Sequence, residues 1–189
     1  MSSIIKVDTI QNQSGANIIS ESSNTITVGA SGDTTNVIGT LNKDGVAVEN
    51  TPAFSATKSG QTTGQSDSTW TKITYDTELL DSDGKFADSR FTPTIAGKYF
   101  ITLSATTGTS SASSLEASSV GIYKNGSQIT GASNNSKTEN EVELADHTAS
   151  CIVELDTNDY IEGYVYINNS TGTNRITTSQ LSGYRIIGA

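Results

Sequence analysis

The sequence contains a single cysteine, Cys151, among 189 residues. One thiol cannot form an intrachain disulfide, so a small secreted domain held together by disulfides is excluded. The chain also lacks any run of about 18 apolar residues, and no segment resembling a signal peptide follows Met1. We therefore expect a protein that is made in a cytoplasm and inserts into no membrane. If it acts outside a cell, lysis or an assembled particle must carry it there.

Hydrophobic and aromatic residues are scarce, at 33% and 6% of the chain, which is little for a self-sufficient core of this size. Charged residues make up only 16%, so this is not the composition of a highly charged disordered chain. Runs with helical spacing are missing too, which predicts an all-β fold. The net charge of −9 and the scattered basic residues argue against nucleic acid as a partner.

Residues 1–50 contain no aromatic residue. Small apolar residues recur there between clusters of turn-forming residues, at a spacing of about ten residues that is typical of successive short strands. They are Ile4, Ile5, Val7, Ile10, Ile18, Ile19, Ile26, Val28, Val37, Ile38, Leu41, Val46 and Val48. Such strands form no stable sheet alone, so we expect a β-rich attachment and trimerisation stalk in which three copies wrap one another. The alternative is a disordered, linker-like arm.

Thr51-Pro52-Ala53 marks the boundary to a second domain, residues 51–189, because a residue before proline favours extended chain. Eight or more short strands separated by turns predict a sandwich or barrel there. The expected strands are Ala53–Ala56, Thr69–Asp76, Val120–Lys124, Val142–Leu144, Ala149–Leu155, Tyr160–Ile167 and Leu181–Ile187, together with those of the segment Asp83–Ala105.

The segment Asp83–Ala105 carries three of the four phenylalanines and predicts a β-hairpin. In this interpretation Asp83-Gly84 and Ala96-Gly97 are turns, and a strand with strict alternation begins at Lys98. By contrast, Gly108–Ser119 is a low-complexity Ser/Thr stretch that predicts a flexible loop. We expect this loop and Gly131–Thr138 to be contact regions for a partner.

Taken in order, several segments resemble the jelly roll shared by complement globular heads and tumour necrosis factor. They are Ala53–Ala56, Asp83–Phe86, Phe91–Pro93, Gly97–Phe100, Val120–Gly126, Ala149–Leu155 and Leu181–Ile187. The resemblance covers about 135 residues, from Ala53 to the C-terminus, and implies an antiparallel jelly-roll sandwich that forms homotrimers. The collagen Gly-X-Y stalk is absent, and the β-rich residues 1–50 stand in its place.

The opening segment Ser3–Gln11 resembles the start of virion structural proteins of marine bacteriophages, particularly tail-fibre proteins. Asn24–Asp33 is similar to the repeat that follows in those proteins. This resemblance implies a virion protein that needs no signal peptide, because lysis releases the particle.

His147 and Cys151 are the only candidates for an imidazole–thiolate pair. Four residues apart on one strand, they would lie about 13 Å apart, too far for a proton-transfer hydrogen bond. Cys151 shares its strand face with Val153 and Leu155, which predicts a packed and inert thiol, and His147 beside Asp146 is expected in a turn. No catalytic residue is therefore assigned.

Three further groups of residues are candidates for a binding or catalytic site. Glu139, Glu141 and Glu143 alternate on a strand and predict a solvated face, with Val142 and Leu144 turned inward. The twelve-residue calcium-binding pattern is not matched by Asp81-Ser82-Asp83-Gly84 with Asp88, and these residues predict a turn. The alternative is a weak calcium site between subunits. No cofactor or metal is assigned.

Tyr160, Tyr164 and Tyr166 share one face of the predicted strand Tyr160–Ile167. We expect them near a threefold axis, although tyrosines can also stack on sugars.

These observations predict a non-enzymatic bacteriophage virion protein, a homotrimeric tail fibre or spike that adheres to a host glycan or surface protein. Residues 1–50 would contact other virion proteins. The alternatives are a capsid decoration or head-fibre trimer at a local threefold of the shell, a polysaccharide-degrading spike, and a secreted lectin-like trimer. Avidity from three equal loop sets would let weak contacts suffice for adhesion.

Overall fold

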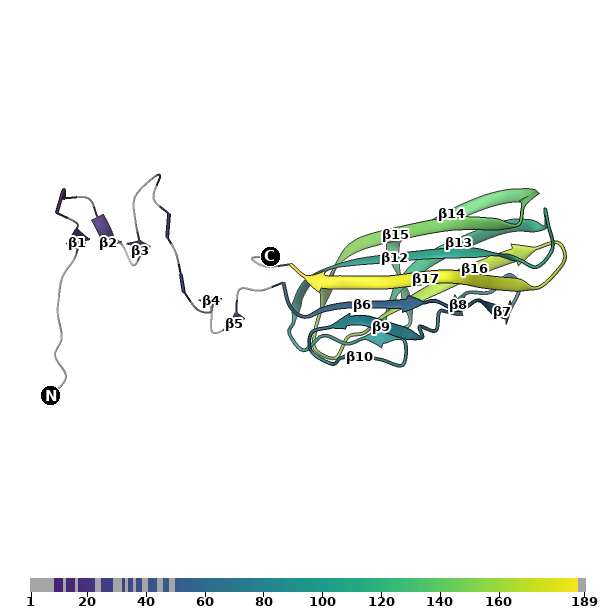
Figure 1. Ribbon diagram of the computed structural model, residues 1–189, viewed down its shortest axis with the longest axis horizontal. Coiled ribbons are helices and arrows are strands. Elements are labelled where there is room, and N and C mark those ends of the chain that lie inside the picture. The colour runs from purple at the N-terminus through teal and green to yellow at the C-terminus, as the bar shows by residue number, and fades with distance from the viewer. Residues whose placement is uncertain are drawn as a thin grey trace. The chain divides into compact units, whose positions relative to one another are not determined.

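The computed structural model describes residues 50–186 without interruption. In the N-terminal part it describes residues 9–11, 13–15, 17–22, 25–28, 32, 34–35, 37–38, 41–43 and 46–47. The chain divides into two compact units, Met1–Val48 and Glu49–Ala189, which we call the arm and the head. The regular elements of the described residues are β-strands (Figure 1). Within the same residues there is no helix that could cross a membrane.

The arm contains two small antiparallel sheets. β1 (Thr9–Gln11), β2 (Asn17–Ser22) and β3 (Thr25–Val28) form a three-stranded sheet in that order, and β4 (Asn42–Lys43) pairs with β5 (Val46–Ala47). The strands coincide with the recurring β-branched residues, whose side chains suit a pleated surface. The predicted β-rich character of this segment is confirmed. Ile4, Ile5, Val7 and Val48 lie outside the described residues.

The head is a sandwich of two six-stranded antiparallel sheets. Sheet I has the order β15-β12-β17-β6-β9 with β7 beside β17, and sheet II has the order β10-β11-β16-β13-β14 with β8 beside β16. In Figure 1, β17 of sheet I lies in front of β16 of sheet II.

The strands of the two sheets differ greatly in length. Sheet I consists of β6 (Ala53–Lys58), β7 (Thr62–Gln65), β9 (Thr77–Asp81), β12 (Gly97–Thr109), β15 (Leu144–Leu155) and β17 (Asn174–Arg185). Sheet II consists of β8 (Thr71–Lys72), β10 (Phe86–Ala87), β11 (Arg90–Phe91), β13 (Leu115–Lys124), β14 (Ser127–Val142) and β16 (Ile161–Asn169). The long strands form the centre of each sheet, and most of the short ones lie toward one edge of each sheet.

The core lies between the sheets and follows from the alternation of the strands. In β12, Tyr99, Ile101 and Leu103 are fully buried, while the residues between them point outward. In β6, Phe54 is buried and its ring stacks on that of Phe91 from sheet II, with the ring centroids 4.2 Å apart. The aromatic contact therefore joins the two sheets across the core.

The segment Asp83–Ala105 is not one hairpin. β10 and β11 do pair, with Phe86 opposite Phe91, but β12 belongs to the other sheet. The chain crosses between sheets at Thr92–Ala96, where Pro93 is buried and the hydroxyl of Tyr99 donates a hydrogen bond to the carbonyl oxygen of Ile95 at 2.5 Å. A proline lacks the N–H that a continuing ladder needs, so pairing stops at this corner.

The two predicted contact regions, of which Gly108–Ser119 was expected to be a loop, are mostly strand. β12 continues to Thr109 and β13 begins at Leu115, so only residues 110–114 of Gly108–Ser119 form a turn. Ser114 is buried, and its hydroxyl donates to the carbonyl oxygen of Ser111 at 2.6 Å. Gly131–Thr138 lies inside β14, paired with β13. Hydroxyl-rich sequence was wrongly interpreted as loop because hydroxyl groups can be satisfied inside a sheet.

Other strand predictions need smaller corrections. Of Thr69–Asp76, only Thr71–Lys72 is strand, and β17 begins at Asn174, well before Leu181. Glu143 forms a bend between β14 and β15, and Val142 and Leu144 are exposed rather than turned inward. Ile187, the predicted end of the last strand, lies outside the described residues.

Candidate functional site

His147 lies inside β15 with its ring in the interior of the head, not in the predicted turn. It is 2% exposed, its Nε2 lies 2.7 Å from the hydroxyl of Ser118, and its Nδ1 lies 3.2 Å from Oδ1 of Asn134. Burial lowers the pKa of His147, and the neighbouring Asp146 opposes this only in part. The neutral ring satisfies both contacts, with Nδ1–H donating to Asn134 and Nε2 accepting from Ser118.

Ser118, His147 and Asn134 thus form a serine–imidazole–amide arrangement that sequence inspection missed. Its geometry resembles that of a hydrolase triad. Ser118 and His147 are both buried, however, so no substrate carbonyl can approach the hydroxyl. We interpret this group as a hydrogen-bond network that connects β15 with β13 and β14. The only sequence signal was the lone histidine itself.

Cys151 takes no part in this network. It is half-buried on the interior face of β15, packs against the hydrophobic core with Val153, and has a thiol pKa raised by burial. A raised pKa keeps the sulfur protonated and unreactive.

The acidic candidates have structural partners. Asp81 accepts hydrogen bonds from the backbone N–H groups of Asp83 and Phe86, at 3.3 and 2.6 Å, as in a side-chain-stabilised turn. Glu143 forms an ion pair with Arg175. In the part of the chain that the structure describes, no three His, Cys, Asp or Glu side chains are arranged to hold a metal ion.

The outward face of sheet I carries an exposed row of apolar side chains. Ile152, Phe100, Tyr184 and Ala53 lie side by side on β15, β12, β17 and β6, each opposite the next in register. Ile152 is 65% exposed and Tyr184 is 42% exposed, and the rings of Phe100 and Tyr184 lie 5.7 Å apart. We call these four residues the head row. Within residues 50–186 its outermost side chains stay exposed, and an exposed apolar surface of this kind is typical of an interaction site.

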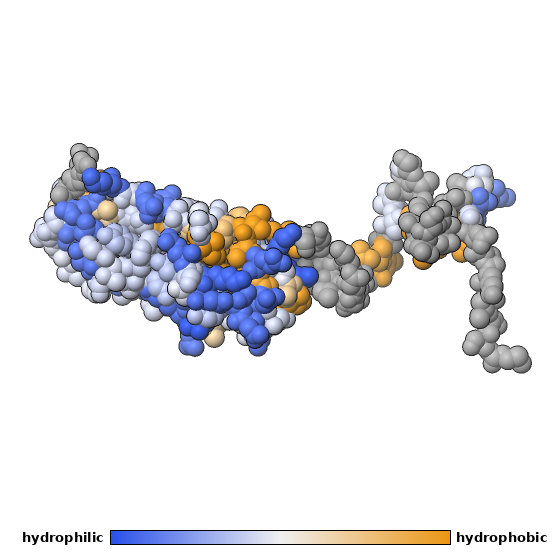
Figure 2. All heavy atoms as spheres, turned by 180° about the vertical axis from the view of Figure 1, so that it is seen from behind, coloured by the Kyte–Doolittle hydropathy of each residue, from blue (hydrophilic) through white to orange (hydrophobic). Residues whose placement is uncertain are grey.

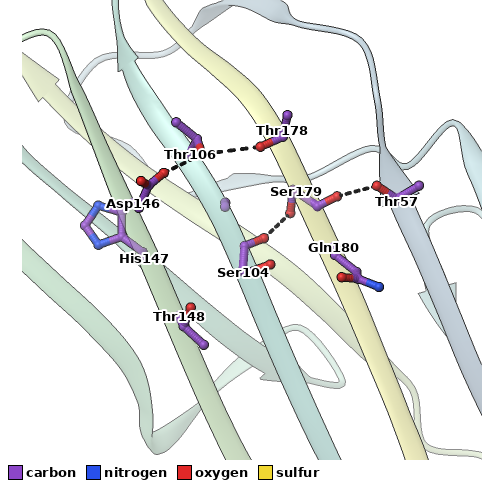
Figure 3. Close-up of a pocket in the computed structure, with 10 residues that line it drawn as sticks. Thr57, Ser104, Thr106, Asp146, His147, Thr148, Thr178, Ser179 and Gln180 are labelled. Atoms are coloured by element: carbon purple, nitrogen blue, oxygen red, sulfur yellow. Dashed lines mark hydrogen bonds between the residues drawn. The ribbon is translucent and has the colours of Figure 1, made fainter.

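Polar side chains cover much of the same face, although Leu80 of β9, which lies opposite Ser55, is an exposed apolar residue. Successive cross-strand rows behind the head row contain hydroxyl, amide and carboxylate groups: Ser150, Thr102, Ser182 and Ser55; Thr148, Ser104, Gln180 and Thr57; and Asp146, Thr106 and Thr178. The last two of these rows line a shallow groove (Figure 3).

The groove's polar groups largely satisfy one another. The hydroxyl of Thr106 donates to Asp146 at 2.5 Å, and that of Thr178 donates to Thr106 at 3.3 Å. The groove therefore offers a polar surface on the same face as the head row.

A second exposed apolar row lies in the arm. Ile10 of β1, Ile19 of β2 and Val28 of β3 stand opposite one another in register and are between 39% and 52% exposed. We call them the arm row. Three strands expose one apolar face here, although β-branched side chains contribute most when a facing layer covers them.

Comparison with known proteins supports the fold. The globular domain of a zebrafish complement 1qA protein is 15% identical, with a TM-score of 0.52 over 71% of this chain and 97% of that domain. Murine APRIL, in a crystal structure at pH 8.5, is 11% identical, with a TM-score of 0.48 over 71% of this chain and 98% of that chain. The head is a jelly roll of the complement globular-domain type. No protein-family model and no curated protein matches the sequence.

This result confirms the predicted all-β jelly-roll sandwich. The resemblance rested on segments that the structure places in β6, β10, β11, β12, β13, β15 and β17. What the sequence alone did not reveal was the head row, because Phe100, Ile152 and Tyr184 become neighbours only through strand register. Phe100 alternates with the buried Tyr99 and Ile101, and this phase was the one available signal that its ring points outward.

Proposed function

We propose that this protein is a non-enzymatic structural component of a bacteriophage virion, a homotrimeric tail fibre or spike that adheres to the host surface. The observation that carries the proposal is the head row, an apolar strip across four strands on which Ile152 and Tyr184 are exposed. Three copies related by a threefold axis could each cover the row of a neighbour.

The free energy gained by burying the head row favours association. Burying one large apolar side chain contributes about 1.5–3 kcal/mol, and each subunit of a trimer would bury Ile152, Phe100 and Tyr184. The arm row offers a second apolar surface for the same partners, and the composition of the chain supplies little else to cover either row. Obligate interfaces resemble a core divided between chains.

The bacteriophage assignment draws its support from the sequence. Ser3–Gln11 resembles the start of phage fibre proteins, and residues 1–50 are proposed to contact other virion proteins. The absence of enzymatic activity is supported by the burial of Ser118 and His147. The polysaccharide-degrading alternative would require an accessible pair of acidic groups, and Glu143, Asp81 and Glu162 are instead held in structural contacts.

Light scattering on the full chain tests the assembly. We expect a mass three times the 19.8 kDa of the chain, and a stable monomer at micromolar concentration would overturn the proposal. A capsid decoration trimer predicts the same mass. Cryo-electron microscopy of the virion separates the two, because density at a local threefold of the shell places the protein on the capsid.

A further inference from the structure

The outward face of sheet II differs from that of sheet I because its rings lie together in one cluster. Trp70, Tyr123, Tyr164 and Tyr166, which we call the aromatic group, are half-buried there. The ring of Trp70 lies 5.9 Å from that of Tyr123 and 5.8 Å from that of Tyr166, and Tyr123 stacks on Tyr164 at 4.0 Å. The expected position of Tyr160, Tyr164 and Tyr166 near a threefold axis stays a prediction, and the head row lies on the other sheet.

The backbone makes room for this group at Gly121. A Cβ atom there would lie 3.2 Å from both Trp70 and Tyr123, closer than ordinary contact allows. The missing side chain lets the indole of Trp70 lie over β13, between Tyr123 of that strand and Tyr166 of β16. The rings are thus packed side by side over the sheet, with part of their surface left to solvent.

A buried ion pair beside the rings contacts one of them. Glu162 is 3% exposed, with Lys72 Nζ at 2.6 Å and Arg90 Nη2 at 3.1 Å. The hydroxyl of Tyr164 donates to the same carboxylate at 3.4 Å, and the guanidinium of Arg90 lies 4.3 Å from the centre of the Tyr160 ring. A platform held in this way loses little freedom when a ligand binds.

A groove of about 670 Å³ adjoins the aromatic group. Register places Ser119 between Tyr166 and Asn135, and places Ala117 between Asn168 and Lys137, so the groove continues along the same strands. The amide nitrogen of Asn168 donates to Glu116 at 2.8 Å, which holds both side chains at the groove wall. The lining therefore offers amide, hydroxyl, carboxylate and ammonium groups beside flat rings.

We propose that the aromatic group and this groove bind a neutral oligosaccharide. This inference rests on the proposed function, because it names the class of ligand to which the adhesive protein would bind. A sugar ring has apolar C–H faces that stack on aromatic rings, and hydroxyl groups that need donors and acceptors together. Asn135, Asn168 and Glu116 supply both. The chain's net charge of −9 repels a polyanionic glycan or nucleic acid.

The hydropathy of the surface agrees with this choice of ligand. In the view from behind, most of the head's surface is hydrophilic or neutral, and hydrophobic residues gather toward one end (Figure 2). An apolar protein partner would need a more extended hydrophobic surface than the rest of this face offers.

The chain carries its own reporter, because Trp70 is its single tryptophan. The full-length protein is titrated with a panel of neutral oligosaccharides of the glucan, mannan, galactan and chitin types at up to millimolar concentration. We expect at least one to shift or quench the emission of Trp70, with matching heat in calorimetry. Failure of the whole panel to change either signal overturns the inference, as does binding confined to acidic saccharides.

Variants locate the site. Trp70→Ala should weaken calorimetric affinity about tenfold or more, and Trp70→Phe should restore much of it by keeping a ring. Asn135→Ala, an exposed change that spares the fold, should weaken affinity about three- to tenfold. Asn158→Ala, an equally exposed amide in a distant turn, is the control. Equal affinities for the Asn135 and Asn158 variants would overturn the assignment.

Light scattering on the same samples separates this inference from the proposed assembly. A trimer that binds none of the sugars refutes only the saccharide site. A monomer whose binding is lost in Trp70→Ala refutes only the trimeric appendage.

Discussion

The head and the arm are built from the same kinds of strand, yet they bury their apolar residues very differently. The head closes a core between two sheets, with Phe54, Phe91 and Leu103 fully buried. The arm leaves Ile10, Ile19 and Val28 in an exposed row. Among the described residues of the arm the three strands form one layer, so we expect a chain with little hydrophobic content to complete its burial with other copies. We therefore expect the head to fold by itself and the arm to need partners.

The largest expected effect of a substitution lies in the head's core. Phe91→Ala removes a ring that stacks on Phe54 and contacts Tyr99 at 5.8 Å. We expect it to lower the free energy of unfolding by about 3–5 kcal/mol, measured by urea denaturation of the full chain. The arm control is Ile38→Ala, whose side chain is highly exposed, and which should stay within about 0.5 kcal/mol. Equal losses in both variants would show that the two regions do not differ as described.

A charge in the head row should act on association rather than on folding. Ile152→Asp places a carboxylate where the proposed trimer buries an apolar side chain, and three such charges repel one another. We expect the concentration at which the trimer dissociates to rise by at least about 100-fold, measured by sedimentation equilibrium. Thr130→Asp puts the same charge on an exposed position of sheet II and is the control. If the Ile152→Asp variant associates as tightly as the wild type, sheet I does not form the trimer interface.

The matching change in the arm should be weaker. Ile19→Ser trims the central residue of the arm row, which lies between Ile10 and Val28. Because it removes apolar area without adding a charge, we expect about a tenfold weaker association at most, with no change in the unfolding of the head. Loss of head stability in this variant would contradict the independence of the two units.

The sequence was informative wherever local patterns decide the structure. Alternation from Lys98 onward predicted a strand, and the order of short motifs predicted the jelly roll that the comparison confirms. Prediction from the sequence failed where contacts between residues far apart in the chain determine the structure. Turn chemistry could not show that β12 leaves the sheet of β11. Likewise, His147 looked like a turn residue because its partners, Asn134 and Ser118, lie 13 and 29 residues away.

The same limit applies to both candidate surfaces. The head row joins residues from four strands, and the aromatic group joins residues from two strands with Trp70, which precedes β8; only the fold makes them neighbours. A list of tyrosines in the sequence could not distinguish Tyr99, which is buried in the core, from Tyr164, which is half exposed. Burial depends on strand phase, and a bulge such as that near Ala117 in β13 changes the phase within one strand.

The smallest effect we predict concerns pH and belongs to the head alone. The pKa of His147 is lowered by burial, so the folded head binds a proton less readily than the unfolded chain, whose imidazole has a pKa of about 6.5. The stability contributed by the neutral ring is complete above this value, and it is lost as pH falls below it. Urea midpoints should decrease between about pH 7 and pH 5, and His147→Gln should flatten this dependence. The carboxyl groups of Asp76 and Asp159 have pKa values lowered to about 2, so their contributions are lost only below about pH 4. An identical slope in the wild type and in His147→Gln would mean that protonation of this buried ring does not destabilise the head.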